Sequence, residues 1–63
     1  MHKWARMIKD GRVYKVVKVA RQKNGEMWVE LQVGYDLNRY ARLDDEVEIL
    51  TNEESAMMEL IYG

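Results

Sequence analysis

Residues 23–35 read Lys-Asn-Gly-Glu-Met-Trp-Val-Glu-Leu-Gln-Val-Gly-Tyr, and this stretch decides the fold. Asn24-Gly25 suits the two positive φ angles of a type I′ turn, and both flanks are rich in β-forming residues, so the stretch predicts a β-hairpin. After the turn, apolar residues occupy every second position, which is typical of a strand with one buried face. These residues are Met27, Val29, Leu31, Val33 and Tyr35. Trp28 is therefore expected on the opposite face.

A two-residue turn would also fix which residues of 12–22 and 26–35 face each other. The expected inner pairs are Tyr14 with Tyr35, Val16 with Val33, and Ala20 with Val29. Lys18 falls on that inner side opposite Leu31, so it must extend to a rim, or a bulge near Val16-Val17 must shift the register. The expected outer pairs include Arg21 with Trp28, Val19 with Glu30 and Val17 with Gln32.

Asp10-Gly11 predicts a second tight turn, between strands 3–9 and 12–22. Such a turn sets Arg6 opposite Lys15, and a directly opposed pair of like charges destabilises a sheet. A helix therefore stays open as an alternative for the first segment, with Gly11 at its end. The residues that match its spacing are Trp4, Met7 and Ile8.

Two further strands, 39–43 and 46–50, and one helix, 52–62, complete the expected single domain of residues 1–63. Thr51 and Glu54 have the spacing of a capping box, which predicts the start of the helix, and Gly63 can end it. Its apolar stripe is Met57, Leu60 and Ile61. A helix this short is unstable alone, so we expect the stripe to dock, either on an open end of the barrel or on the outer face around Trp28.

The five short strands, with a break at Leu43-Asp44-Asp45-Glu46-Val47 before the last one, resemble the small SH3-like barrels, including Tudor-like and KOW-like domains. The resemblance covers about residues 3–50 and implies a mainly β fold, a five-stranded meander barrel followed by the short helix. The chain shows neither the peptide-binding aromatic groove of signalling SH3 domains nor a complete aromatic cage. A meander with a C-terminal helix is also similar to the small dimeric carbon-storage RNA regulators, but their loop motifs are missing here.

The composition argues against catalysis, metal binding and membrane insertion. Cysteine is absent and the single histidine is His2, at the terminus, so neither a zinc site nor a nucleophile with its base is expected. The adjacent acids Asp44, Asp45 and Glu46 are expected to form a solvated turn and not a cation site. No apolar run is long enough to cross a bilayer and no signal peptide is visible, so we expect a cytoplasmic protein without cofactors that is not an enzyme.

Charge is divided unevenly along the chain. Residues 1–23 hold eight Lys or Arg and one Asp, whereas residues 24–63 hold two Arg and ten Asp or Glu. The two halves can neutralise each other within the fold, or the basic half can contact nucleic acid while aromatic rings stack on bases. For this alternative the candidate residues are Arg6, Lys15, Arg21, Lys23, Trp28 and Tyr40.

The preferred interpretation is a small binding module that contacts a protein partner or a second copy of itself. An indole on the polar side of a half-buried strand either lies beneath another element or anchors a partner. Candidate partner-binding residues are Trp28, Trp4, Arg21, Val17 and Val19. The small size suits an accessory regulator or inhibitor, a kind of protein that phages and mobile elements often encode.

Overall fold

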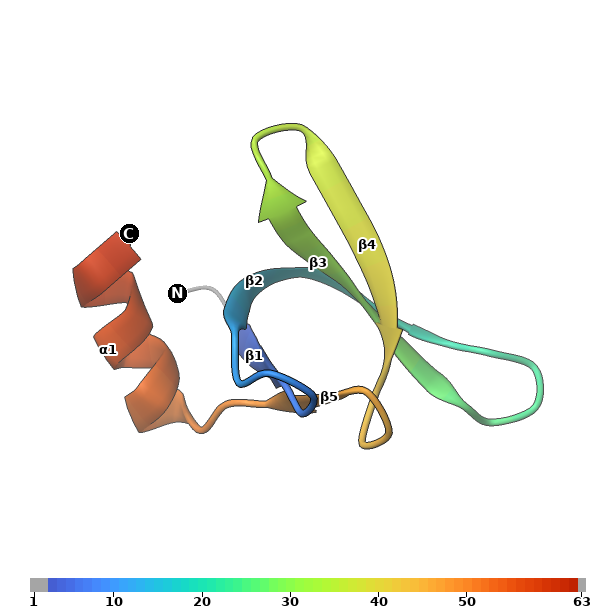
Figure 1. Ribbon diagram of the computed structural model, residues 1–63. Helices are drawn as coiled ribbons and strands as arrows, with labels where there is room; N and C mark the ends of the chain where they lie inside the picture. Colours follow the sequence, from blue (N-terminus) through green and yellow to red (C-terminus); the bar gives the residue numbers. More distant parts are fainter. Residues whose placement is uncertain (1–2, 63) are drawn as a thin grey trace.

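The computed structural model describes residues 3–62, which form a five-stranded antiparallel sheet followed by one helix (Figure 1). The elements are β1 (Trp4–Met7), β2 (Val13–Arg21), β3 (Met27–Gly34), β4 (Leu37–Arg42), β5 (Val47–Ile49) and α1 (Asn52–Tyr62). The mainly β prediction is confirmed, and the helical alternative for the first segment is wrong because β1 is a strand. The expectations for His2 and Gly63 lie outside the described residues.

The sheet curls strongly but does not close into a barrel (Figure 1). Its strand order is β4-β3-β2-β1-β5, so β4 and β5 form the two edges. After β4 the chain turns at Asp44, whose φ of 69° lies in the left-handed region that Asp tolerates. A single bridge between Leu43 and Val47 joins the two edges within the described residues. The fold is therefore β-barrel-like, with an open seam between β4 and β5.

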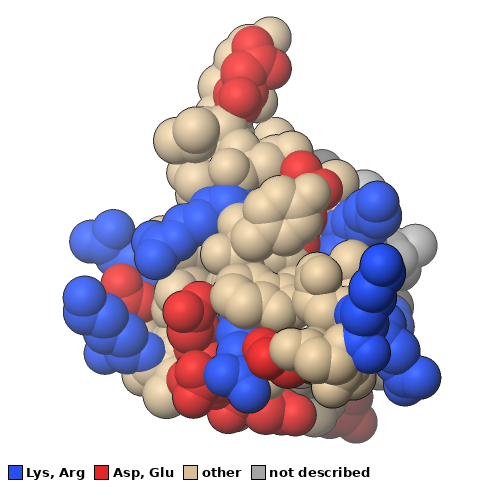
Figure 2. Space-filling model, turned by 90° about the vertical axis from the view of Figure 1, so that its right-hand side faces the viewer, with Lys and Arg blue, Asp and Glu red and all other residues tan. Residues whose placement is uncertain are grey.

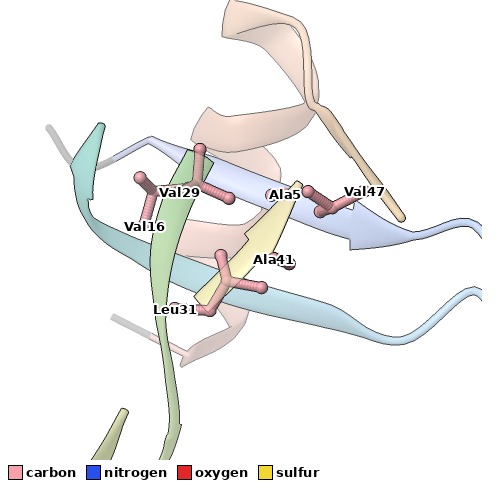
Figure 3. Packing of buried hydrophobic residues seen from close by; sticks show 6 residues of the cluster. All are labelled: Ala5, Val16, Val29, Leu31, Ala41 and Val47. Carbon is pink, nitrogen blue, oxygen red and sulfur yellow. The ribbon is translucent and has the colours of Figure 1, made fainter. Parts of the chain in front are cut away.

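The core lies inside the curl, and every strand contributes to it (Figure 3). Its buried members are Ala5, Val16, Val29, Leu31, Ala41 and Val47. The alternation predicted for β3 is confirmed at Val29 and Leu31, which are both fully buried. Tyr35 departs from it because the strand ends at Gly34, and its side chain is 95% exposed in the following turn.

The hairpin between β2 and β3 has a three-residue loop, so the predicted type I′ turn is wrong. The Gln22 amide donates to the Glu26 carbonyl at 2.7 Å, which leaves residues 23–25 as the loop. Gly25 alone in this loop has a positive φ, 88°. The Oδ1 atom of Asn24 instead accepts the Glu26 amide at 3.0 Å, which stabilises the loop from its side chain. This geometry suits a type I turn followed by a left-handed glycine.

The longer loop changes every cross-strand pair expected between β2 and β3. Next to the loop, the observed pairs are Val19 with Val29, Ala20 with Trp28 and Arg21 with Met27. A bulge between Val16 and Lys18 then shifts the register again, as the bulge alternative for Lys18 predicted. Lys18 lies opposite Glu30 instead of Leu31, and Val16 stays in the core. The longer loop thus keeps Lys18 out of the hydrophobic interior, and the bulge returns Val16 to it.

The predicted tight turn at Asp10-Gly11 is also wrong. The Met7 amide donates to the Arg12 carbonyl at 2.7 Å, which makes residues 8–11 a four-residue loop. The like-charge pair of Arg6 and Lys15 is therefore not formed. Arg6 lies opposite Val13 on one side and opposite Glu48 of β5 on the other.

Helix α1 begins with the predicted capping box. The Thr51 hydroxyl accepts the Glu54 amide at 3.1 Å, and Glu54 accepts the Thr51 amide at 3.1 Å. The helix lies beside β1, and its buried residue is Ser55. The prediction that the apolar stripe docks is wrong, because Met57, Leu60 and Ile61 are all more than half exposed.

Candidate partner-binding site

Trp28 lies on the outer face of the sheet, the side of β2, β3 and β4 turned away from the core. Its cross-strand neighbours are Ala20 on β2 and Arg42 on β4. Two residues further along β3 on the same face, Glu30 lies between Lys18 of β2 and Tyr40 of β4. The indole is half-buried and α1 lies at the other end of the molecule, so no helix covers it. We call this surface the Trp28 face: Val17, Lys18, Ala20, Trp28, Glu30, Tyr40 and Arg42.

Two further apolar side chains reach solvent on the Trp28 face. Tyr40 is 56% exposed and Val17 is 53% exposed. Val17 is the extra residue of the bulge, between Val16 opposite Leu31 and Lys18 opposite Glu30. Exposed apolar groups on one face, with polar groups around them, are typical of interaction surfaces. Figure 2 shows the side of the molecule that lies at the right of Figure 1, with Lys and Arg on both flanks, uncharged side chains between them, and Asp and Glu gathered in the lower half.

Hydrogen bonds and ion pairs hold the polar part of the Trp28 face in place. The Glu30 carboxylate accepts a hydrogen bond from Asn38 at 2.9 Å and one from the Tyr40 hydroxyl at 3.5 Å. The Arg42 guanidinium pairs with Glu26 at 3.0 Å. These contacts orient Tyr40 and Arg42 beside Trp28 before any partner arrives, which lowers the entropy lost on binding.

The other predicted partner-binding residues do not all belong to this face. Trp4 is only 5% exposed, because its side chain packs against α1. The centroid of its ring lies 6.1 Å from that of Tyr62. Val19 and Arg21 face the inner side, opposite Val29 and Met27, because the loop is one residue longer than expected. Val19 still has 41% of its surface exposed near the hairpin end. Of the five candidates, the structure brings together Trp28 and Val17.

The cations proposed for nucleic-acid binding are spread over the molecule. The Arg6 guanidinium pairs with Glu48 at 3.1 Å and with Glu54 at 3.2 Å, and the hydrogen bonds to Glu54 and then Glu48 raise its pKa. The Lys15 ammonium lies 5.4 Å from the centroid of the Trp4 ring. Lys23 belongs to the hairpin loop. Tyr40 and Trp28 share one face, but these cations do not gather around them.

Helix α1 exposes a second apolar surface, the stripe that the sequence interpretation expected to dock on the rest of the domain. Leu60 is 88% exposed, and Ile61 and Met57 are 63% and 62% exposed. The helix turns its other side to β1 because Trp4 donates a hydrogen bond to Glu59 and Arg6 pairs with Glu54. The polar partners on β1, more than the apolar stripe, set the rotation of α1.

Residues 3–62 contain no cluster of three or more His, Asp or Glu side chains placed to hold a metal ion. Within the same residues, the one helix falls short of the length and apolar character needed to span a membrane. Comparison with protein-family models, curated proteins and solved structures returns no match. The site geometry alone therefore supports the function proposed below.

Proposed function

We propose that this domain is a non-enzymatic binding module of SH3-like architecture that contacts a protein partner through the Trp28 face. The observation that carries the proposal is the half-buried indole of Trp28, which no helix covers and which lies one cross-strand row from the exposed side chain of Tyr40. Tryptophan and tyrosine are frequent anchors at protein interfaces because each offers a large, rigid apolar surface with a polar tip. Lys18 at the margin would orient the partner by charge. By covering a surface of its partner, such a module acts as a regulator or an inhibitor.

A protein partner fits this face better than nucleic acid does. Glu30 lies in the middle of the face and would repel phosphate groups. Arg42 and Arg6 already contact carboxylates, so they have less to gain from phosphate. Glu30 can instead accept hydrogen bonds from N–H or O–H groups of a protein partner, as it accepts them from the Asn38 amide and the Tyr40 hydroxyl here.

Capture of the partner with matched surface variants tests the proposal. A tagged wild-type protein and the Trp28→Ser variant are used on the same host lysate, and the bound proteins are identified by mass spectrometry. Tyr35→Ser is the control, because Tyr35 is 95% exposed but lies outside the Trp28 face. We expect wild type and Tyr35→Ser to retain the same protein and Trp28→Ser to lose it, while all three remain folded by circular dichroism.

Photo-crosslinking then separates the Trp28 face from the exposed side of α1. A benzophenone amino acid replaces Tyr40 in one variant and Leu60 in another, since both side chains are more than half exposed. Crosslinks to the partner from position 40 support the proposal. Crosslinks from position 60 alone place the interface on α1 and contradict it. Retention on oligonucleotides at low salt that is lost at high salt would favour nucleic acid instead.

A further inference from the structure

Asn24-Gly25 is the one Asn-Gly step in the chain, and it lies in the loop of the hairpin between β2 and β3 (Figure 1). The side-chain carboxamide of an asparagine can be attacked by the backbone nitrogen of the next residue. Glycine hinders this attack least, because it has no Cβ and its backbone moves most freely. Both residues are exposed, and open space surrounds Gly25. Water therefore reaches the groups that such a reaction needs.

The reaction is a deamidation that consumes water and needs no other reagent. Base removes the proton of the Gly25 amide, and the nitrogen attacks Cγ of Asn24. A bond forms between these two atoms, the Cγ–Nδ2 bond breaks, and Nδ2 takes a proton from water and leaves as ammonia. A second water then opens the resulting five-membered succinimide at either carbonyl. The product is aspartate or isoaspartate, and the net change is one water gained and one ammonia lost.

The folded loop holds both reacting groups in other contacts. The Gly25 amide donates to the Gln22 carbonyl at 3.0 Å, which protects its proton from base as it would protect it from hydrogen exchange. The Asn24 carboxamide is bonded at both ends to Glu26. Its Oδ1 atom accepts the Glu26 amide at 3.0 Å, and its Nδ2 atom donates to the Glu26 carboxylate at 2.6 Å. Ring closure moves Cγ onto the Gly25 nitrogen, and these contacts oppose that movement.

From these contacts we infer that Asn24 is a site of spontaneous deamidation whose rate is set by opening of the hairpin loop, with Glu26 as the positioning residue that holds the carboxamide. The inference goes beyond the proposed function, because no partner takes part. Its product would still affect the Trp28 face. A carboxylate in place of the Nδ2 donor repels the Glu26 carboxylate, which holds the Arg42 guanidinium at 3.0 Å.

Peptide mapping of the full chain by mass spectrometry tests the inference. The wild-type protein is kept at mildly alkaline pH, in buffer and in guanidinium chloride, and conversion of each asparagine is followed over time. We expect Asn24 to convert about tenfold or more faster in guanidinium chloride, because unfolding removes the hydrogen bonds of the loop. Asn38 and Asn52 are followed by residues with long side chains, which hinder the attack, so both should stay intact over the same time. Equal rates at Asn24 in the two solutions, or no conversion there after unfolding, would overturn the inference.

Variants separate the contact with the carboxamide from the ion pair of Glu26. Glu26→Ala removes the acceptor of Asn24 Nδ2 and should speed conversion in the folded protein about three- to fivefold. Glu26→Gln keeps an acceptor oxygen and should react at close to the wild-type rate. Arg42→Gln removes the ion pair and leaves the carboxamide contact, so it should also react as wild type does.

The same variants can overturn the role of Glu26. An unchanged rate in Glu26→Ala would show that its carboxylate does not hold the carboxamide. Equal acceleration in Glu26→Ala and Arg42→Gln would assign the effect to the ion pair instead. In guanidinium chloride all four proteins should convert at one rate, and a difference there would mean that the substitutions act on the reaction itself and not through the folded loop. Circular dichroism in buffer checks that each variant is folded.

Discussion

The indole Nε1 of Trp4 donates a hydrogen bond to the Oε1 atom of Glu59 at 3.0 Å, which joins strand β1 to helix α1. The Trp4 ring also lies next to Tyr62, and the Lys15 ammonium stands over it. One side chain thus connects β1, β2 and α1. A domain of 63 residues buries a smaller share of its surface than a larger domain does, so such a connection matters for its stability.

Replacement of Trp4 should therefore destabilise the whole domain. Trp4→Ala removes a buried aromatic side chain, at a cost of about 3–5 kcal/mol, which is comparable with the total stability of a chain this short. Trp4→Phe keeps most of the packing and loses the hydrogen bond to Glu59, so we expect it to lower the free energy of unfolding by about 1–2 kcal/mol. Urea unfolding followed by circular dichroism measures both. Equal midpoints for Trp4→Ala and wild type would show that α1 does not depend on this residue.

The capping box at the start of α1 should contribute through the Thr51 hydroxyl. Thr51→Ala removes the acceptor of the Glu54 amide and should cost about 1 kcal/mol. Thr51→Ser keeps an oxygen at the same position and serves as the matched control, with stability close to wild type. The midpoints of thermal unfolding compare the two. If both variants lowered the midpoint of thermal unfolding by the same amount, the hydroxyl would not be the cause of the stabilisation.

Acid should weaken the start of α1 through Glu54. The hydrogen bond from the Thr51 amide, followed by that from Arg6, holds the pKa of Glu54 below its usual value of 4.5. Because the folded pKa is the lower one, the stabilisation is fully present above pH 4.5 and is lost as the pH falls through the folded pKa. An NMR titration of the Glu54 side chain should show the depressed pKa in wild type and a return toward the usual value in Arg6→Gln. An unshifted titration in wild type would contradict the geometry.

Gly25 should tolerate asparagine better than alanine. Its φ of 88° is unfavourable for a residue with a Cβ, while open space surrounds the position, so the cost of Gly25→Ala is conformational and about 1 kcal/mol. Asparagine adopts left-handed conformations more readily, so Gly25→Asn should cost less. Chemical denaturation ranks the two variants. The reverse order would mean that the loop does not keep this conformation in solution.

Alternation and local capping were predictable from the sequence because each depends on neighbours along the chain. The core side of β3 and the Thr51–Glu54 box follow from such local patterns. Turn length was not predictable: Asn24-Gly25 suits a two-residue turn, yet the Asn24 side chain stabilises a longer loop. That one extra residue moves Val19 and Arg21 to the inner side. A single local error therefore changed the composition of the candidate site.

The rotation of α1 was not predictable for a different reason. Its apolar stripe suggested the docking side, but the contacts that orient the helix run from Glu54 and Glu59 to Arg6 and Trp4, about fifty residues earlier. Contacts at such a separation leave no periodic pattern in the sequence. The same long-range packing buries Trp4, whereas Trp28 lies half-buried between Ala20 and Arg42 on the outer face.

Acrylamide quenching of Trp28 fluorescence, with and without the captured partner, tests the central claim most directly. The Trp4→Phe variant leaves Trp28 as the sole indole, and Trp28→Phe leaves the buried Trp4 as the control. We expect Trp28 to be quenched in the free protein and protected in the complex, while Trp4 stays protected in both. Quenching of Trp28 that is unchanged by a saturating partner would contradict the assignment of the Trp28 face as the binding surface.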